Sequence, residues 1–169
     1  MDLLPEIEQR FSVREFTADE VDRAAIDRIV EAGRRAPSAK NRQPWRFIVA
    51  QDGALRQRLQ DACFGQEWVG IAPVTVALCT TNVDYKMPNG QLAYPVDLSI
   101  AGSFMSLQAV REGLGTCMIT TFDEQEVKSI LTVPYSMRVV MLITMGYSDA
   151  EKPHLDRLPT DRIVAFDHW

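Results

Sequence analysis

The run from Pro73 to Thr80 is the feature that most limits how this chain can fold. It reads Pro-Val-Thr-Val-Ala-Leu-Cys-Thr, and none of its side chains is charged. A strand that is apolar on both faces has to be covered on both faces, which is what helices on each side of a sheet provide. Val139 to Gly146, which follows Arg138, is a second run without charged side chains. The sequence therefore predicts a buried sheet between layers of helices.

Two shorter β-rich runs complete the expected sheet, at Arg46–Gln51 and Thr116–Thr121. Amphipathic periodicity predicts helices over residues 2–10, 17–35, 54–63, 96–113 and 123–131. We expect Thr17 and Glu20 to form a capping box at the start of the second helix, and Asp123 to cap the last one. Residues 81–95, with Pro88, Asn89-Gly90 and Pro95, are expected to form a loop and are a candidate substrate-access loop.

Two segments carry apolar side chains that are expected to be covered by another surface. The helix expected over residues 96–113 is apolar around most of its circumference, which indicates burial in the core or at a subunit interface. Residues 147–169 are polar at first but end in Ile-Val-Ala-Phe-Asp-His-Trp. Apolar side chains at a chain end are seldom left in water, so we expect this tail to dock on another surface.

Composition bounds the function. The 169 residues suit one domain, and a net charge of −5 argues against a dedicated nucleic-acid or anionic-membrane surface. The three cysteines and two histidines show no metal-ligand spacing, so we expect no metal site. We find no signal peptide and no apolar run of transmembrane length, which predicts a cytoplasmic protein without membrane contact.

Two stretches are candidate binding elements. The first, Arg10-Phe-Ser-Val-Arg14, places a hydroxyl and two guanidinium groups within five residues, an arrangement suited to an anion such as phosphate. The second, Ala36 to Phe47, holds small and polar residues between two prolines. The alternatives are ordinary: surface salt bridges for the arginines, with Glu6, Glu15 or Asp19, and a simple helix-to-strand connection for the loop.

The chain shows no protein-borne catalyst. Gly-x-Ser-x-Gly, P-loop, Gly-x-Gly-x-x-Gly and His-Glu-x-x-His motifs do not occur in it. A chain with few candidate acids and bases, but with arginines placed to hold a phosphate, fits an enzyme whose cofactor supplies the chemistry. We therefore expect no catalytic side chain of its own.

Taken in order, the motifs resemble the nitroreductase family of FMN-dependent oxidoreductases. The resemblance rests on Arg10-x-Ser12-x-Arg14-x-Phe16 and on Ala36-Pro-Ser-Ala-x-Asn-x-Gln-Pro-Trp-x-Phe47. Weaker matches to the family follow in order along nearly the whole chain. They are Ala72-Pro73, Gly113–Cys117, Phe122-Asp123, Gly146-Tyr147 and Arg157–Pro159.

The resemblance implies an α+β fold: a three-layer sandwich with a central, mainly antiparallel sheet flanked by helices, in an obligate homodimer with two FMN sites at its interface. Residues 1–169 would form a single FMN-binding domain, with 147–169 docking on the partner subunit. The cofactor-binding residues implied are Arg10, Phe11, Ser12, Arg14, Pro37, Ser38, Ala39, Asn41, Gln66, Ile119, Thr120, Thr121 and Arg157.

The same resemblance suggests individual roles. Arg10 and Arg157 would pair with the phosphate, and Arg14 would approach the N1/O2 edge of the flavin. Pro37, Ser38, Ala39 and Asn41 would come from the partner subunit. Backbone groups at 119–121 would lie near N5, and Gln66 would contact the polar edge of the ring. One departure is Leu155, where many relatives carry a basic residue; either His154 or Lys152 replaces it, or the phosphate is held more weakly.

The implied activity is ping-pong hydride transfer from NADH or NADPH to an electron-poor acceptor such as a nitroaromatic or a quinone. Three alternatives remain open at the sequence level. The chain can be a specialised family member, such as a dehalogenase, a flavin-fragmenting enzyme or an azoline oxidase. It can be a flavin-binding or sensory protein without turnover, or an α/β interaction domain with coincidental motifs. Phe64, Trp68, Tyr85 and Tyr94 either line the pocket or pack in the core.

Overall fold

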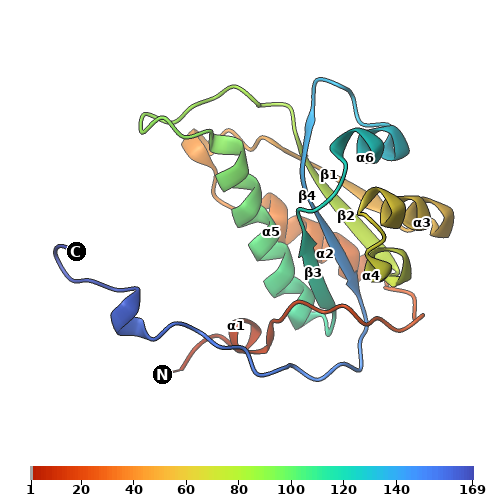
Figure 1. The fold of residues 1–169 in the computed structure, drawn as a ribbon, viewed down its shortest axis with the longest axis horizontal. Helices are drawn as coiled ribbons and strands as arrows, with labels where there is room; N and C mark the ends of the chain where they lie inside the picture. The colour runs from red at the N-terminus through yellow and green to blue at the C-terminus, as the bar shows by residue number, and fades with distance from the viewer. Residues whose placement is uncertain (1) are drawn as a thin grey trace.

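A four-stranded antiparallel sheet lies at the centre of the computed structural model, which describes residues 2–169 (Figure 1). The strand order is β1-β2-β4-β3, and every neighbouring pair is antiparallel. The strands are β1 (Trp45–Ala50), β2 (Val74–Thr80), β3 (Gly115–Ile119) and β4 (Arg138–Gly146). All seven residues of β2 are buried, as its uncharged sequence predicts.

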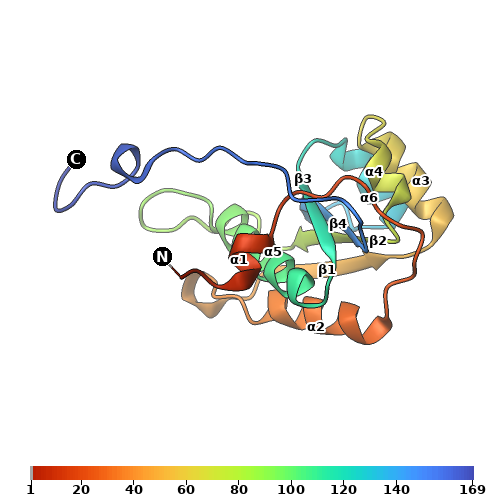
Figure 2. The same ribbon diagram turned by 90° about the horizontal axis from the view of Figure 1, so that it is seen from below.

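Helices cover both faces of this sheet (Figures 1 and 2). They are α1 (Pro5–Gln9), α2 (Arg23–Arg34), α3 (Gly53–Ala62), α4 (Glu67–Ile71), α5 (Ala93–Arg111) and α6 (Glu124–Leu131), with short 3-10 turns η1 (Ala39–Asn41) and η2 (Thr160–Arg162). Alternate residues of β2 serve the two cores. Val76 and Leu78 pack with α2 and α5, whereas Ala77 and Cys79 pack with α3, α4 and α6. The three-layer α+β fold expected from the sequence is confirmed.

The helix cap predicted at Asp123 is present, and Asp52 caps a second helix in the same way. The Asp52 carboxylate accepts a hydrogen bond of 2.9 Å from the Leu55 backbone N–H at the start of α3. The Asp123 carboxylate accepts bonds from the backbone N–H groups of Gln125 and Glu126 at the start of α6. Each cap satisfies donors that the first helical turn leaves free. The sequence therefore marks these two helix starts correctly.

The capping box predicted at Thr17 and Glu20 is wrong. Helix α2 begins only at Arg23, and the Thr17 hydroxyl donates instead to the Asp19 carboxylate at 2.7 Å. A side chain that satisfies its neighbour in this way holds a turn and competes with helix formation. Residues 17–22 therefore form an irregular connection ahead of α2.

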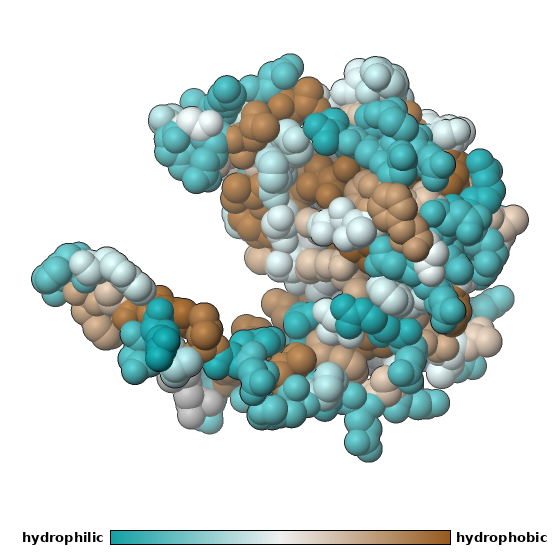
Figure 3. All heavy atoms as spheres, in the orientation of Figure 1, coloured by the Kyte–Doolittle hydropathy of each residue, from teal (hydrophilic) through white to brown (hydrophobic). Residues whose placement is uncertain are grey.

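Helix α5 begins three residues earlier than expected and is not buried all round. It takes in Pro95, which occupies the first turn, where proline is tolerated. Its inner face packs on the sheet, but Val96 and Phe104 are 41% and 40% exposed. Figure 3 shows apolar surface along the outer side of this helix. A shallow apolar groove between α5 and α1 includes Leu4, Phe104 and Leu107.

The C-terminal segment runs away from the body of the molecule (Figures 1 and 2, blue). All residues from 151 to 169 are exposed, and Phe166 and Trp169 are 85% and 89% exposed. Its contacts with the body lie at its start: the Thr17 N–H donates to the Tyr147 carbonyl, and the Lys152 ammonium donates to the Glu8 carbonyl. Within residues 2–169, no helix is long and apolar enough to cross a membrane.

Candidate functional site

The predicted anion-binding stretch, residues 10–14, lies alongside the outer edge of β3. Ser12 pairs with Thr116 in a parallel bridge, and the Val13 N–H donates to the Thr116 carbonyl at 2.9 Å. Val13 passes so close to Gly115 that a Cβ there would come within 2.5 Å of a Val13 methyl. The glycine thus allows residues 10–14 to lie against the sheet, and this fixes the backbone positions of Arg10 and Arg14.

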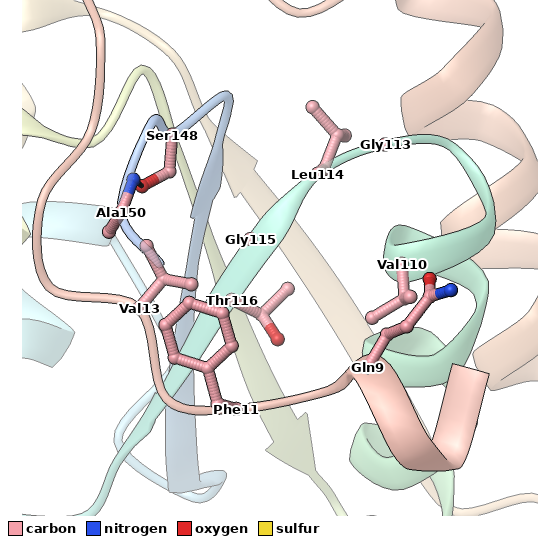
Figure 4. A pocket seen from close by; sticks show the side chains of 10 residues that line it. All are labelled: Gln9, Phe11, Val13, Val110, Gly113, Leu114, Gly115, Thr116, Ser148 and Ala150. Carbon is pink, nitrogen blue, oxygen red and sulfur yellow. Dashed lines mark hydrogen bonds between the residues drawn. The ribbon is translucent and has the colours of Figure 1, made fainter. Parts of the chain in front are cut away.

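Alternation along this extended stretch separates its side chains into two sets. Phe11 and Val13 line a small hollow of about 200 Å³ together with Leu114 and Thr116 (Figure 4). Arg14 lies elsewhere, with its guanidinium carbon 5.2 Å from the centre of the Trp68 ring. Phe11, predicted among the cofactor-binding residues, therefore lies in this hollow, on the side of the stretch away from Arg14.

Arg10 and Arg14 converge on the same part of the sheet. Burial raises the pKa of the Cys117 thiol on β3, and the nearby positive charges of Arg14 and Arg10 oppose that rise. The alternative of surface salt bridges does not hold for the described residues. Glu6 pairs with Arg111 at 3.1 Å, and Arg10 and Arg14 form no salt bridge in residues 2–169. Both charges are therefore available to a ligand.

Arg157, from the tail, comes to the same side as Arg10. The two arginines line one hollow of about 600 Å³ beside α1, with Lys152, His154 and Leu155 also in its wall. Arg157 has no carboxylate partner in the described part of the chain, whereas His154 lies 3.2 Å from the Asp156 carboxylate. The structure thus brings together two of the three arginines singled out in the sequence, from opposite ends of the chain, and places two basic residues next to Leu155.

A second group of predicted residues gathers where α4 meets the end of β3. The Gln66 side-chain amide donates to the Cys63 carbonyl at 2.8 Å and to the Thr121 carbonyl at 2.9 Å. The two hydrogen bonds of Gln66 tie Thr121, in the loop that follows β3, to the start of α4. Trp68, on α4, contacts Arg14, so these residues adjoin the arginine stretch.

The proline-flanked loop lies elsewhere in the chain. Ser38 Oγ accepts a bond from the Gln43 N–H at 3.0 Å, and Asp97 accepts one from the Ala39 N–H at 2.8 Å. Asp97 belongs to the first turns of α5, whereas the hollow beside Phe11 lies at Val110 and Gly113. Thirteen residues of α-helix span roughly 20 Å. One chain therefore does not bring Pro37–Asn41 to Arg10–Arg14, as the views in Figures 1 and 2 show.

Two residues that contact the predicted site residues, Asp97 and Trp68, were not themselves predicted as site residues. Asp97 is only 3% exposed and holds the Pro37–Asn41 loop; the available signal was one acidic residue in an otherwise apolar helix. Trp68 carries the Arg14 contact, and its indole N–H is buried without a hydrogen-bond partner in the described residues. The sequence left Trp68 open between pocket and core, because its partner lies more than fifty positions away.

Comparison with known proteins agrees with this geometry. The family model of the nitroreductase family matches residues 7–91 and 64–147. A nitroreductase family protein from Clostridium novyi NT is 31% identical, with a TM-score of 0.82 over 88% of this chain and 87% of its own. The chain belongs to the nitroreductase family. It is an oxidoreductase, as that family's members are.

Other members differ in what their names say they do. An FMN-dependent nitroreductase from Clostridium difficile R20291 is 27% identical, with a TM-score of 0.86 over 97% of this chain and 98% of its own. An NADH dehydrogenase of Thermus thermophilus is 29% identical over 92% of this chain and 91% of its own length. A 5,6-dimethylbenzimidazole synthase of Rhodospirillum rubrum is 29% identical over 88% and 84%. The family is thus established, while its members' names span several reactions.

Proposed function

We propose that this protein uses NAD(P)H to reduce nitroaromatics, quinones or similar electron-poor acceptors with FMN as its cofactor. The observation that carries the proposal is the convergence of three arginines on one side of the sheet, none of them paired with a carboxylate of residues 2–169. A phosphate-bearing, electron-accepting ring system matches that charge, and the family supplies NADH- and FMN-dependent relatives.

Residues of this chain fit FMN in three places. Arg10 and Arg157 share a hollow and would bind the phosphate with forked, charge-assisted hydrogen bonds. Arg14, steadied by Trp68, would stand beside the N1/O2 edge, where a cation stabilises negative charge. The buried, unpartnered indole N–H of Trp68 marks a polar atom that a ligand can satisfy. Arg10, Arg14 and Arg157 would hold the FMN, which would supply the hydride-transfer chemistry between NAD(P)H and the acceptor.

The protein's own groups would bind and orient, and none needs to act as acid, base or nucleophile. His154 and His168 lie in the exposed tail. Burial raises the pKa of the Cys63 and Cys79 thiols to about 11, so both are neutral at pH 7. The backbone of residues 119–121, tied to Gln66, would define the position of the ring near N5.

The second half of each site would come from a second chain. Residues 1–169 act as a single domain in this proposal, and residues 147–169 dock on the partner subunit of a homodimer. Because α5 separates Pro37–Asn41 from Arg10–Arg14 within one chain, a symmetric partner is the route by which both reach one flavin. The apolar groove on α5 and the exposed tail are the surfaces that such a dimer would cover.

The specialised reactions and a purely flavin-binding role are the competing proposals. A binder without turnover would hold FMN and stay oxidised or reduced, whereas an enzyme would cycle many times with an added acceptor. A dehalogenase or a flavin-fragmenting enzyme would show slow turnover with quinones and nitroaromatics, and fast turnover with its own substrate. Multiple turnovers with menadione and with 4-nitrobenzyl alcohol therefore separate these cases.

The decisive experiment is the visible absorption spectrum of the purified protein, recorded before and after NADH is added without oxygen. We expect a flavin band that bleaches and returns when a quinone is added. A band that persists with NADH and also with NADPH would contradict the reductase role while leaving FMN binding intact. A protein without a band, even after incubation with FMN, would overturn the proposal.

A further inference from the structure

Two cations lie over one aromatic ring beside the proline-flanked loop. The guanidinium carbon of Arg42 is 4.0 Å from the centre of the Tyr85 ring, and the Lys40 ammonium is 5.8 Å from it. Tyr85 belongs to the loop between β2 and α5, so these contacts join the two loops at the start of α5. A cation over the face of an aromatic ring is attracted by the ring's negative face, so both contacts are favourable. Lys40, Arg42 and Tyr85 together form what we call the Tyr85 patch.

The backbone under this patch holds a fixed shape. Lys40, Asn41 and Gln43 have φ of 53°, 52° and 50°, in the left-handed region that residues other than glycine seldom adopt. The loop is pinned on both sides, by Ser38 Oγ to Gln43 and by Asp97 to Ala39. Conformations of this kind persist only where their surroundings enforce them, and they are common at ligand sites. The two cations are therefore placed by the fold.

The charges of the Tyr85 patch are not neutralised by the protein. In residues 2–169, neither Lys40 nor Arg42 forms a salt bridge, and the buried carboxylate of Asp97 is engaged by the Ala39 N–H. Asp84 and Lys86, the neighbours of Tyr85 in the sequence, are both exposed and carry opposite charges. By contrast, six other arginines each pair with a carboxylate within residues 2–169, and they are Arg23, Arg28, Arg34, Arg35, Arg111 and Arg138.

An unpaired cation pair in a chain with a net charge of −5 is a place for an anion. In the proposed dimer, Pro37–Asn41 reaches the partner's flavin, so the Tyr85 patch would stand at the entrance of that site. We propose that the patch recognises a phosphate or carboxylate on the molecule that approaches the flavin, and so selects anionic donors or acceptors. This inference rests on the proposed function and adds the substrate class to it.

The anion has two possible sources, and paired probes distinguish them. The 2′-phosphate of NADPH is one source, tested by calorimetric binding of adenosine 2′,5′-bisphosphate against adenosine 5′-monophosphate to the FMN-loaded protein. A carboxylate on the acceptor is the other, tested by kcat/KM for 4-nitrobenzoate against 4-nitrobenzyl alcohol. Within each pair, the two probes differ mainly by the anionic group.

The variants are the double substitution Lys40→Ala with Arg42→Ala, and Tyr85→Leu, which removes the ring and keeps both cations. Arg58→Ala is the matched control, because Arg58 is exposed on α3 and has no carboxylate partner in the described residues. In the probe pair that matches the true anion, we expect the double variant to lower the affinity or kcat/KM for the more anionic probe about tenfold. The value for the neutral or less charged probe should change far less. Tyr85→Leu should give a smaller loss of the same kind.

FMN content is measured first in every variant, because it distinguishes a failure of the proposed FMN-dependent function from a failure of the role proposed for the Tyr85 patch. If the double variant holds normal FMN and both probes of each pair keep their wild-type values, the Tyr85 patch is only a contact between loops and the inference fails. Equal losses for both probes of a pair would overturn it as well, since they show a general defect. A wild-type protein that binds no FMN would instead overturn the proposed function, and this inference with it.

Discussion

The arginines of the proposed FMN site stand on two segments that are built in opposite ways. Arg10 and Arg14 stand on a stretch that is hydrogen-bonded to β3 and packed so closely that Gly115 has no room for a side chain. Arg157 stands on a tail whose residues 151–169 are all exposed. The difference shows that one chain alone fixes the part of the site nearest the sheet. The tail part depends on a surface that the single chain does not provide.

Apolar side chains on the tail indicate what that surface must offer. Ile163, Phe166 and Trp169 are 58%, 85% and 89% exposed, and a Phe or Trp buries 150–250 Å² when it docks. Burial of apolar surface contributes roughly 25 cal/mol per Å². The apolar groove of α5 in a second copy is the matching surface in our proposal.

Deleting residues 151–169 should have the largest effect on this comparison. The variant would lose Arg157 and the docking segment, and with the dimer it would lose the partner's Pro37–Asn41 loop. We expect a monomer by light scattering, with FMN binding weakened roughly a hundredfold or more, since two ligand contacts of about 1.5–2 kcal/mol each are removed. A truncated protein that stays dimeric with full FMN content would show that the tail is dispensable.

Arg14→Ala tests the anchored half and should rank next. Loss of one charged hydrogen-bond donor costs about 2 kcal/mol, or roughly thirtyfold in the FMN dissociation constant, and should slow flavin reduction. Arg14→Lys keeps the charge without the planar fork that stacks on Trp68, and should give an intermediate loss. Fluorescence titration with FMN and stopped-flow reduction measure both effects. Normal FMN content with unchanged reduction kinetics in Arg14→Ala would refute the role of this residue.

Gly115→Ala perturbs the anchored half without touching an arginine. The new Cβ would come within 2.5 Å of Val13, so residues 10–14 must shift away from β3. We expect an unfolding free energy lower by about 1–3 kcal/mol, as for overpacked sites, and a loss of FMN affinity smaller than that of Arg14→Ala. Gly53→Ala is the control, since its nearest atom is 3.7 Å away. Equal behaviour of the two variants in urea titrations would contradict the close contact.

The smallest expected effect is a pH dependence of the folding stability, which comes from two buried thiols in the body of the domain and not from the tail. Burial raises the pKa of Cys63 and Cys79 from 9.0 to about 11. A thiol whose pKa is higher in the folded state contributes stability that is complete below pH 9 and is lost as pH rises toward 11. The urea midpoint should therefore fall between pH 9 and 11, and fall less in Cys63→Ala. If the urea midpoint of Cys63→Ala fell with pH as steeply as that of the wild type, groups other than this thiol would determine stability between pH 9 and 11.

Most of the fold was predictable because its signals are local. The uncharged run of β2, the caps at Asp52 and Asp123, and the left-handed Gly113 at the end of α5 each depend on a few neighbouring residues. The start of α2 failed for the opposite reason. A threonine followed by acidic residues also suits a turn, and Asp19 rather than a helix N–H engages the hydroxyl.

The site was predictable only as far as its motifs extend. Arg10, Arg14 and Arg157 were named in advance, but the Trp68 contact, the Asp97 bond and the stacking of Arg42 on Tyr85 all join residues more than forty positions apart. Such pairings are set by how helices and loops meet over the sheet, and no local pattern records them. The motif gives no signal at Lys40 and Arg42, because it leaves these two positions unspecified.

The placement of residues 11–13 also matters for solubility. β3 is an outer strand of the sheet, and the Ser12–Thr116 pairing covers part of its free edge. Uncovered strand edges are templates for association with other chains. A substitution that releases this stretch would therefore do more than remove two arginines from the site. It would also expose an unpaired β edge, so variants that lose the cofactor in this way should be prone to aggregate.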